Sequence, residues 1–354
     1  MLLPLSLIYG LVTAVRNWLF DQEILKTTIF PIPIICIGNL SVGGTGKTPH
    51  TEFVIDLLQS EWKTAMLSRG YKRTTKGFVL ADEKSVSQTI GDESFQIYQK
   101  FSEITVAVDE KRVRGVRKLL DIHPDLRAVI LDDAFQHRYI YSGLSIVLTD
   151  FYNLYTRDLV LPAGTLREWK AGCKRADIIV VTKCPADLKP IEMRIIETEI
   201  KPENNQMLFF STYVYNEIIP VFPEANHENW SLAKVKESEA HVLLVAGIVN
   251  PKPIIECINK YTEHIDSLFF GDHHNFSPKD YAAISSEFDK IENESKIILT
   301  TEKDAARLVN DPNYPEKLKC RIFALPIRVE ILNNQEPLFI QKIKNYVVEN
   351  TRNC

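Results

Sequence analysis

The stretch Ile32-Pro-Ile-Ile-Cys-Ile-Gly-Asn-Leu-Ser-Val-Gly-Gly-Thr-Gly-Lys-Thr-Pro-His50 decides the fold of this chain. It begins with a short apolar run typical of a buried strand, continues into a glycine-rich turn, and reaches Lys47 and Thr48 at the start of a helical pattern. Backbone N–H groups in such a turn can converge on an anion, the lysine adds positive charge, and the threonine hydroxyl can bind Mg²⁺. The stretch therefore predicts a phosphate-binding loop, or P-loop.

The glycine-rich turn departs from the strict P-loop pattern at one position. The pattern has a glycine five residues before Gly46, where this chain has Ser41, but Gly43 and Gly44 can supply the same backbone freedom. A turn that binds no ligand is the alternative. Membrane-cycling ATPases carry a lysine where this chain has Val42, which argues against that subclass. The predicted nucleotide-binding residues are Ser41, Val42, Gly43, Gly44, Thr45, Gly46, Lys47 and Thr48.

Length and composition narrow the class of protein. At 354 residues the chain is long enough for two α/β domains with a sizeable core. A net charge of -4 argues against a nucleic-acid-binding protein. The six cysteines include no C-x-x-C pair and several lie within apolar runs, so we expect the reduced thiols of a cytosolic protein.

The amino-terminal segment predicts an amphipathic helix over residues 2–20. It carries no charge before Arg16, but proline, glycine and that arginine make it a poor transmembrane helix, and it lacks the basic start and cleavage site of a signal peptide. Its small and polar residues recur on one narrow helical face, and these are Ser6, Gly10, Thr13 and Asn17. Such a helix could lie in a membrane interface or pack on the protein's own core, and the pattern does not choose between them.

Apolar runs alternate with helical stretches after the P-loop, which predicts a parallel sheet flanked by helices. Ligands bind at the carboxyl ends of the strands in such sheets, so the residues that follow each run matter most. The expected strands are 34–37, 64–68, 104–108, 128–131, 144–149 and 177–182.

Two acids, Asp132 and Asp133, end one of these runs, as in the second signature of P-loop proteins. We expect Asp132 near a Mg²⁺ ion bound by Thr48, with Asp133 as the alternative. Arg167 lies in a loop of turn-forming residues. It could reach a transferred phosphoryl group, or it could form only a surface pair with Glu168.

Two further segments allow two interpretations each. The run Ser68–Arg73 places three cations and Tyr71 around a glycine, which suits an anionic substrate group or a solvated turn. Asp92 precedes a helical pattern and could be a helix cap or a catalytic carboxylate.

Pro185 stands where a guanine-reading loop has Asp, which favours ATP over GTP.

A second alternation of strands and helices predicts a smaller α/β domain, with runs at 242–247, 267–270 and 297–300. Segments 208–221 and 321–329 suit a two-stranded hinge, which would allow the closure that excludes water in kinases. The adjacent His273 and His274 point in different directions, so a metal pair is not expected; one histidine oriented by an acid, or a capping loop, are the alternatives. The expected parts are 1–30, 31–207, 208–232, 233–320 and 321–354.

Taken together, these motifs resemble those of the tetraacyldisaccharide 4'-kinase family, the lipid A kinases. The matching motifs are, in chain order, Gly38-Asn39-Leu40-Ser41-Val42-Gly43-Gly44-Thr45-Gly46-Lys47-Thr48-Pro49, Ser68-Arg69-Gly70-Tyr71, Gly91-Asp92-Glu93, Asp132-Asp133-Ala134-Phe135-Gln136-His137, Leu161-Pro162-Ala163-Gly164, Lys174-Arg175-Ala176-Asp177, Asp272-His273 and Thr301-Glu302-Lys303-Asp304. The resemblance extends from the amino-terminal helix to about Leu325. The departures are Ala134 where the family often has Gly, and Ser94 and Trp169 where it often has Pro.

The resemblance implies MgATP-dependent phosphorylation of the 4'-hydroxyl of a tetraacylated glucosamine disaccharide 1-phosphate, which yields lipid IVA. It places the enzyme peripherally at the cytoplasmic face of a Gram-negative inner membrane, with a lipid substrate and no nucleic-acid partner. The implied catalytic residues are Lys47, Arg167, the base Asp92 and His273, which orients that base; the implied magnesium residues are Thr48, Asp132 and Asp133; the implied substrate-binding residues are Asn39, Arg69 and Tyr71. The rival functions are a nucleotide-hydrolysing switch protein and a soluble small-molecule kinase or ligase.

Overall fold

The computed structural model describes residues 2–226, 228–248, 250–271, 274, 276–309 and 311–351. The chain divides into two compact units: unit 1 comprises Met1–Tyr213 and Val329–Cys354, and unit 2 comprises Val214–Arg328. The predicted boundaries at 207 and 321 therefore differ from those of the compact units by several residues. The five cysteines within the described part of the chain, Cys36, Cys173, Cys184, Cys257 and Cys320, are free thiols.

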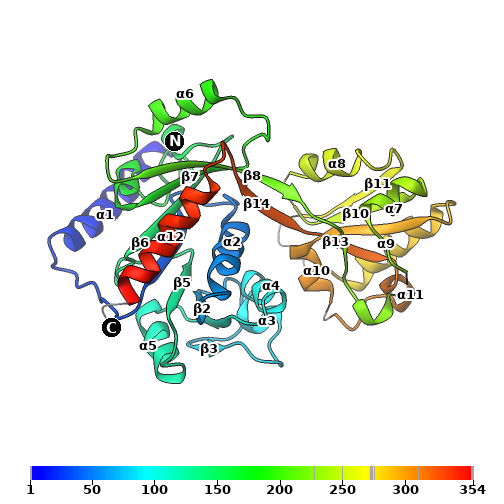
Figure 1. The fold of residues 1–354 in the computed structure, drawn as a ribbon, viewed down its shortest axis with the longest axis horizontal. Helices are drawn as coiled ribbons and strands as arrows, with labels where there is room; N and C mark the ends of the chain where they lie inside the picture. Colours follow the sequence, from blue (N-terminus) through cyan, green and yellow to red (C-terminus); the bar gives the residue numbers. More distant parts are fainter. Residues whose placement is uncertain are drawn as a thin grey trace. The chain divides into compact units, whose positions relative to one another are not determined.

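Unit 1 is built on a nine-stranded sheet with the order β14-β8-β7-β6-β1-β5-β2-β4-β3 (Figure 1). The central strand β1 pairs in parallel with β5 and β6, and β3 is antiparallel to β4. The strands are β1 (Ile34–Asn39), β2 (Thr64–Ser68), β3 (Val79–Leu80), β4 (Thr105–Val108), β5 (Ala128–Asp132), β6 (Leu144–Asp150), β7 (Ile178–Thr182), β8 (Met207–Tyr215) and β14 (Ile327–Ile331). The predicted parallel sheet is confirmed.

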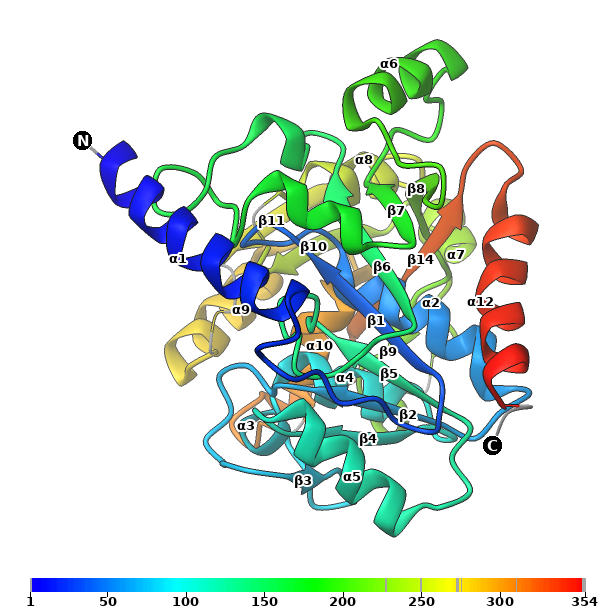
Figure 2. The same cartoon turned by 90° about the vertical axis from the view of Figure 1, so that its left-hand side faces the viewer.

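Both faces of this sheet are covered, which explains why β1 is an unbroken apolar run and not an alternating one. Ile35 and Ile37 face a core shared with α2, α4 and α12, whereas Ile34 and Cys36 face a core shared with α5 and α6. Figure 2 shows these helices around the sheet. The helices of unit 1 are α1 (Leu3–Asp21), α2 (Lys47–Gln59), α3 (Ser87–Ile90), α4 (Asp92–Lys100), α5 (Arg112–Ile122), α6 (Pro190–Ile200) and α12 (Glu336–Thr351), with 3-10 turns at Tyr155–Arg157 and Lys170–Arg175.

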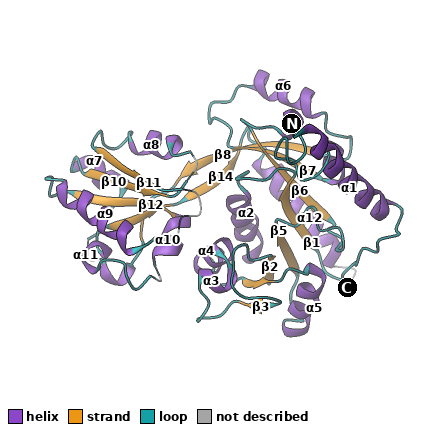
Figure 3. Ribbon diagram, turned by 180° about the vertical axis from the view of Figure 1, so that it is seen from behind, coloured by secondary structure: helices purple, strands orange, loops and turns teal. Residues whose placement is uncertain are grey.

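Unit 2 has a five-stranded sheet with the order β11-β10-β12-β13-β9, in which only the two-residue strand β9 is antiparallel (Figure 3). Its apolar cores also lie on both faces of the sheet. The elements are β9 (Ile219–Pro220), a 3-10 turn (Pro223–Ala225), α7 (Leu232–Glu237), β10 (His241–Ala246), α8 (Lys252–Ile258), β11 (Ile265–Phe269), α9 (Pro278–Lys290), β12 (Lys296–Thr301), α10 (Glu302–Leu308), α11 (Glu316–Lys319) and β13 (Ile322–Leu325).

The chain crosses between the two units in β8 and β14, which are neighbours in the sheet of unit 1. The predicted return strand at 321–329 is wrong in one respect, because two strands occupy this region. Residues 322–325 form β13 in the sheet of unit 2, and a new strand, β14, begins at Ile327. Pro326 lies between them, and a proline has no N–H group with which to continue a strand ladder.

Helix α1 packs on unit 1 through its narrow polar face, while its apolar side chains are exposed. Ser6 and Gly10 are buried, together with Phe20 near the end of the helix. The exposed apolar residues are Leu2, Leu3, Leu5, Leu7, Ile8, Tyr9, Leu11, Val12, Val15 and Trp18, the first of which precedes the helix. By length and composition this is the one helix in the described ranges that could cross a membrane, although its proline, glycine and arginine make it a poor transmembrane helix.

Candidate active site

The P-loop connects the end of β1 to the first residue of α2, as the sequence predicts. Gly43 and Gly46 adopt positive φ angles of 122° and 85°, whereas Ser41 does not, so serine fits where the strict pattern has glycine. A Cβ atom at Gly43 or Gly44 would have no heavy atom within 4 Å. The backbone of the loop is therefore open on the side where a phosphate chain would bind.

The P-loop is held in place by partners that are distant in sequence. Val42 N–H donates to the Thr165 carbonyl at 2.7 Å, and Arg167 N–H donates to the Leu40 carbonyl at 2.7 Å. On the other side of the loop, the Thr182 hydroxyl donates to the Thr45 carbonyl at 2.9 Å, and Lys183 donates to the Gly44 carbonyl. These contacts were not predicted, because no local pattern indicates which loops meet.

The start of α2 is fixed by the buried imidazole of His50. Its Nδ1–H donates to the Gly46 carbonyl at 2.8 Å, so Nε2 accepts from the Ser211 hydroxyl of β8 at 2.9 Å. Burial lowers the pKa of His50 to about 4, although the bond to Gly46 opposes that shift. The ring is therefore neutral at neutral pH and links the P-loop to β8.

The effect of His50 on stability should depend on pH. Because folding lowers its pKa from 6.5 to about 4, the wild-type protein has its full stability above pH 6.5 and loses up to roughly 3 kcal/mol as the pH falls to 4. We expect the difference in unfolding free energy between wild type and His50→Gln to shrink over this window in urea titrations. The exposed His264→Gln serves as control. A difference that stays constant from pH 7 to 4 would contradict the assignment.

Asp132 and Asp133 end β5 beside the P-loop and differ in their surroundings. Asp132 is buried, accepts from the Thr51 hydroxyl at 3.2 Å, and forms no ion pair with a residue that the structure describes. Burial, followed by the charges of Glu93 and Asp133, raises its pKa to about 7. A buried carboxylate with two acidic neighbours would be stabilised by a divalent cation, so Asp132 is the better candidate for a magnesium ligand.

Asp133 is instead held by cations. Arg167 binds it with both terminal nitrogens, at 2.7 and 3.1 Å, and Lys47 Nζ lies 3.9 Å from its Oδ2. Although burial raises the pKa of Asp133, Lys47 and Arg167 bring it below the ordinary value. The predicted alternative of a surface pair between Arg167 and Glu168 is wrong, because Glu168 is buried and pairs with Arg175 at 2.9 Å.

Asp92 is the first residue of α4, and the residue in the capping position is Gly91, with φ 87°. The interpretation of Asp92 as a helix cap is therefore wrong. Helix α4 packs on α2, where Gln96 and Lys100 each donate to the Glu52 carboxylate at 2.7 Å. The charge of Glu93 acts on Asp132, so the start of α4 faces the same side of the sheet as the P-loop.

The basic segment after β2 contains two kinds of arginine. Arg73 donates to the Gly77 carbonyl at 2.6 Å and pairs with Glu110, so its role is structural. Arg69 is exposed and forms no ion pair within the described residues. Burial lowers the pKa of His137 to about 4, and the nearby charges of Arg112, Arg16 and Arg69 lower it further. The positive charges of these three arginines therefore act on His137.

The described residues include part of the motifs of unit 2. His273 lies outside the described residues, whereas His274 bonds Asp280, which caps α9 with Ser277. Asp304 is buried and accepts from Gly247 N–H at 2.8 Å, and it pairs with Arg307 at 3.0 Å. The Asp304 carboxylate therefore ties α10 to the end of β10, which is a structural role that the sequence analysis did not assign.

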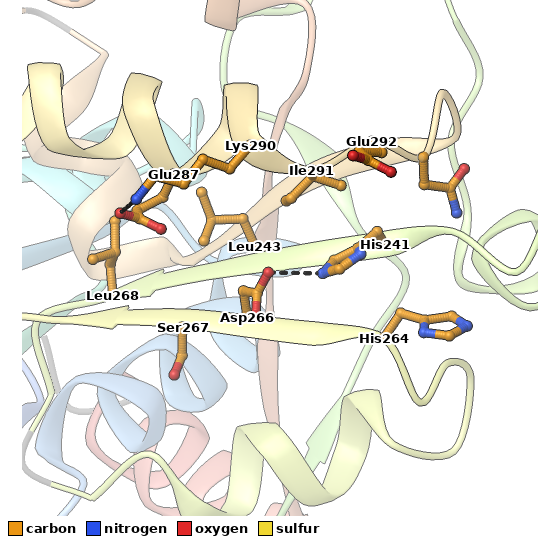
Figure 4. A pocket seen from close by; sticks show the side chains of 11 residues that line it. His241, Leu243, His264, Asp266, Ser267, Leu268, Glu287, Lys290, Ile291 and Glu292 are labelled. Carbon is orange, nitrogen blue, oxygen red and sulfur yellow. Dashed lines mark hydrogen bonds and ion pairs between the residues drawn. The ribbon is translucent and has the colours of Figure 1, made fainter.

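Unit 2 contains a pocket of about 580 Å³ between β10, β11 and the end of α9. His241 pairs there with Asp266 at 2.9 Å (Figure 4). None of the predicted site residues lines it. Within the described part of the chain, no group of three or more His, Cys, Asp or Glu side chains could hold a metal ion.

Comparisons with known proteins identify the family of this chain. A model of the tetraacyldisaccharide-1-P 4'-kinase (LpxK) family matches residues 1–347. Curated proteins called tetraacyldisaccharide 4'-kinase include one from Bacteroides thetaiotaomicron, 51% identical over 99% of this chain and 94% of the relative. Another, from Flavobacterium johnsoniae, is 43% identical over 99% of this chain and 97% of the relative.

A solved structure is also similar over nearly the whole chain. The crystal structure of LpxK from Aquifex aeolicus in complex with ATP superposes with a TM-score of 0.75 at 28% sequence identity, covering 98% of each chain. The family match and the relatives cover the P-loop, the acids after β5 and the segment that carries Arg167. The chain belongs to the tetraacyldisaccharide-1-P 4'-kinase family.

Proposed function

We propose that this chain transfers the γ-phosphoryl group of ATP to the 4'-hydroxyl of a tetraacylated glucosamine disaccharide 1-phosphate, forming lipid IVA in lipid A biosynthesis. The observation that carries the proposal is the cluster of Lys47, Arg167 and Asp133 beside a P-loop whose glycines are open to a ligand. Phosphoryl transfer requires positioning and charge neutralisation more than covalent chemistry, and this cluster supplies both.

The direct test is phosphorylation of the lipid by the purified protein. With γ-labelled ATP and the disaccharide 1-phosphate in detergent, we expect label on the lipid, and none on a 4'-deoxy analogue. GTP should be a poorer donor. Release of labelled inorganic phosphate at an unchanged rate with or without the lipid would contradict the proposal and would favour a nucleotide-hydrolysing switch protein.

Magnesium would be held by the Thr48 hydroxyl and the Asp132 carboxylate. Both are hard oxygen donors of the kind that Mg²⁺ prefers. Burial, followed by the charges of Glu93 and Asp133, raises the pKa of Asp132, and a bound cation would stabilise its charged form. When bound, the ion neutralises charge on the β- and γ-phosphates. Lys47 and the N–H groups of residues 43–44 and 46–48 would contact the same phosphates, whereas the N–H groups of Val42 and Thr45 already donate to Thr165 and Gly43. Arg167 would stabilise the charge that develops on the transferred group.

The acceptor hydroxyl must also lose its proton. We assign Asp92 as the base and His273 as the group that orients it, as the family resemblance implies. Asp92 begins α4 on the side of the sheet where Glu93 interacts with Asp132, so it belongs to the nucleotide side of unit 1. His273 lies outside the described residues, so its part in the reaction rests on the resemblance.

The anionic end of the lipid substrate would bind near the cations that surround His137. Arg69 is the exposed member of that group and Tyr71 follows it in the same turn, while Asn39 lies where β1 meets the P-loop. The Asn39 amide already donates to Thr45 at 2.8 Å, and its side-chain carbonyl oxygen is buried without a partner in the structure. Asn39 is itself fully buried, so it would act on the site by holding Thr45 in the turn of the P-loop.

The exposed apolar face of α1 would dock on the membrane that holds the substrate, at the cytoplasmic face of the inner membrane. The inner face of the helix is hydrogen-bonded to unit 1, so the helix lies along the protein surface. A contiguous apolar face of this kind, with its polar side turned toward the protein, is suited to burial in the lipid headgroup and acyl boundary. Peripheral attachment is therefore the proposed mode.

Polar substitutions on that face should weaken membrane binding. Leu7 and Leu11 are 61% and 63% exposed, and the double variant Leu7→Ser, Leu11→Ser removes apolar surface without touching the hydrogen bonds of α1. We expect a loss of co-sedimentation with anionic vesicles of about tenfold or more. Leu338→Ser, an exposed leucine on α12, is the matched control. Unchanged sedimentation of the double variant would show that another surface binds the membrane.

A further inference from the structure

Asn17, on the inner face of α1, contacts a buried carboxylate. Its Nδ2 donates to Glu168 Oε2 at 2.7 Å. Glu168 is only 2% exposed, and its other oxygen accepts from Arg175 at 2.9 Å and from Gln136 at 3.1 Å. The carboxylate is therefore satisfied by one donor from α1 and two donors from the loops that follow β5 and precede β7.

Gln136 connects Glu168 to Asn39 and Arg167. Its Nε2 uses both hydrogens, one to Glu168 and the other to the Asn39 carbonyl at 2.8 Å. Its amide orientation is thereby fixed, and its Oε1 faces Arg167 Nη1 at 3.4 Å. Arg167 is the residue that grips Asp133. A continuous path of polar contacts thus leads from Asn17 to the P-loop and to the catalytic arginine.

Other contacts of α1 reach the same segments. Tyr9 donates its hydroxyl proton to the Arg167 carbonyl at 3.1 Å, and Arg16 donates to the Gln136 carbonyl at 3.1 Å. Trp169 donates to the Gly10 carbonyl at 2.8 Å, and a Cβ atom at Gly10 would lie 2.6 Å from its ring. The narrow face of α1 is therefore fitted closely to the segment around Arg167.

From this network we propose that Asn17 is a positioning residue for phosphoryl transfer, acting through Glu168 and Gln136 on Arg167. The inference rests on the proposed function and deepens it. Helix α1 would position the segment that carries Arg167, in addition to binding the membrane. Substitutions on the apolar side of α1 should then change membrane binding, whereas substitutions on its inner side should change kcat.

The test compares Asn17→Leu with Thr13→Val on the same face. The Thr13 hydroxyl bonds only the Gly10 carbonyl of its own helix within the described residues, so its loss leaves the network intact. In detergent, we expect Asn17→Leu to lower kcat at least tenfold, with an unchanged KM for ATP and unchanged sedimentation with vesicles. Thr13→Val should keep kcat within twofold. A wild-type kcat for Asn17→Leu, or a loss of vesicle binding that matches the loss of kcat, would overturn the proposal.

Exchanging the amide and the carboxylate between positions 17 and 168 distinguishes loss of this contact from misfolding. Asn17→Asp should lose activity, because two carboxylates would then face each other, and adding Glu168→Gln should restore at least part of kcat by placing an amide donor against the new acceptor. No recovery in the double variant would count against the proposed contact.

Hydrogen exchange provides a readout that does not require the lipid reaction. The amides of Val42 and Arg167, which bond Thr165 and Leu40, should exchange faster in Asn17→Leu than in Thr13→Val. Equal exchange in the two variants would overturn the positioning role even if the chain acted on a different acceptor. A wild-type protein that failed to phosphorylate the lipid would instead refute only the proposed function.

Discussion

Replacing Asp92 by asparagine is expected to lower kcat by about 10²-fold to 10⁴-fold, the range typical of a lost general base. The affinity for ATP should change little, because Lys47 and the P-loop backbone hold the phosphates. The side chain keeps its size, and Gly91 occupies the capping position, so α4 should remain folded. Steady-state kinetics in detergent together with nucleotide-binding titration would measure the two effects separately.

The control for this variant is Asp56→Asn. Asp56 is an exposed aspartate on α2 whose carboxylate, among the residues that the structure describes, accepts only a local bond from Gln59. A double variant with His273→Ala adds a second test. If the two residues act as one unit, the double variant should cost little more than Asp92→Asn alone. A near-normal kcat for Asp92→Asn would leave this aspartate without a catalytic role.

Replacing Arg167 by alanine is expected to lower kcat by about 10³-fold or more, the effect of removing an arginine that stabilises the transferred phosphoryl group. The loss also changes the ground state. Asp133 now shares its charge between Arg167 and Lys47, and without the arginine it would compete with ATP for Lys47. We therefore expect the KM for ATP to rise as well. Initial rates over a range of ATP concentrations would show both changes.

Two further variants test this assignment: Arg167→Lys keeps the charge at this position, and Arg157→Ala is a control at another ion pair. Lysine keeps the charge but cannot bind Asp133 with two parallel bonds, so it should recover only a small part of the activity. Arg157 also pairs with a carboxylate, Glu199, but at an exposed position, and its loss should leave kcat unchanged. A loss of less than tenfold in Arg167→Ala would place this arginine outside the transition state.

Burial gives Asp132 a titration opposite to that of His50. Its pKa rises from 3.8 to about 7 on folding, so in the absence of ligand its contribution to stability is full below pH 4 and is lost as the pH rises through 7. His50 contributes in the opposite sense between pH 6.5 and 4. The two slopes partly cancel in the wild-type protein, which is why the His50 effect is best measured as a difference between variants.

The sequence by itself determined the parallel sheet and the P-loop. The strand pattern of Ile34–Ile37 is unbroken because both faces are buried, and Lys47 begins the helix where glycines free the preceding turn. These features are local, since a strand or a turn is encoded by neighbouring residues. The same local patterns located the acids at the end of β5 and the start of α4.

Only the tertiary structure decided which side chains meet. It placed Arg167 on Asp133 and not on Glu168, put Lys183 on the P-loop, and gave Arg73 a structural partner while leaving Arg69 exposed. It also turned the small polar face of α1 inward and its leucines outward, a choice that helical periodicity allows either way. The physical reason is that periodicity specifies the faces of an element, whereas the partner of each face depends on residues that are distant in the chain, from 34 positions for Arg167 and Asp133 to 151 for Asn17 and Glu168.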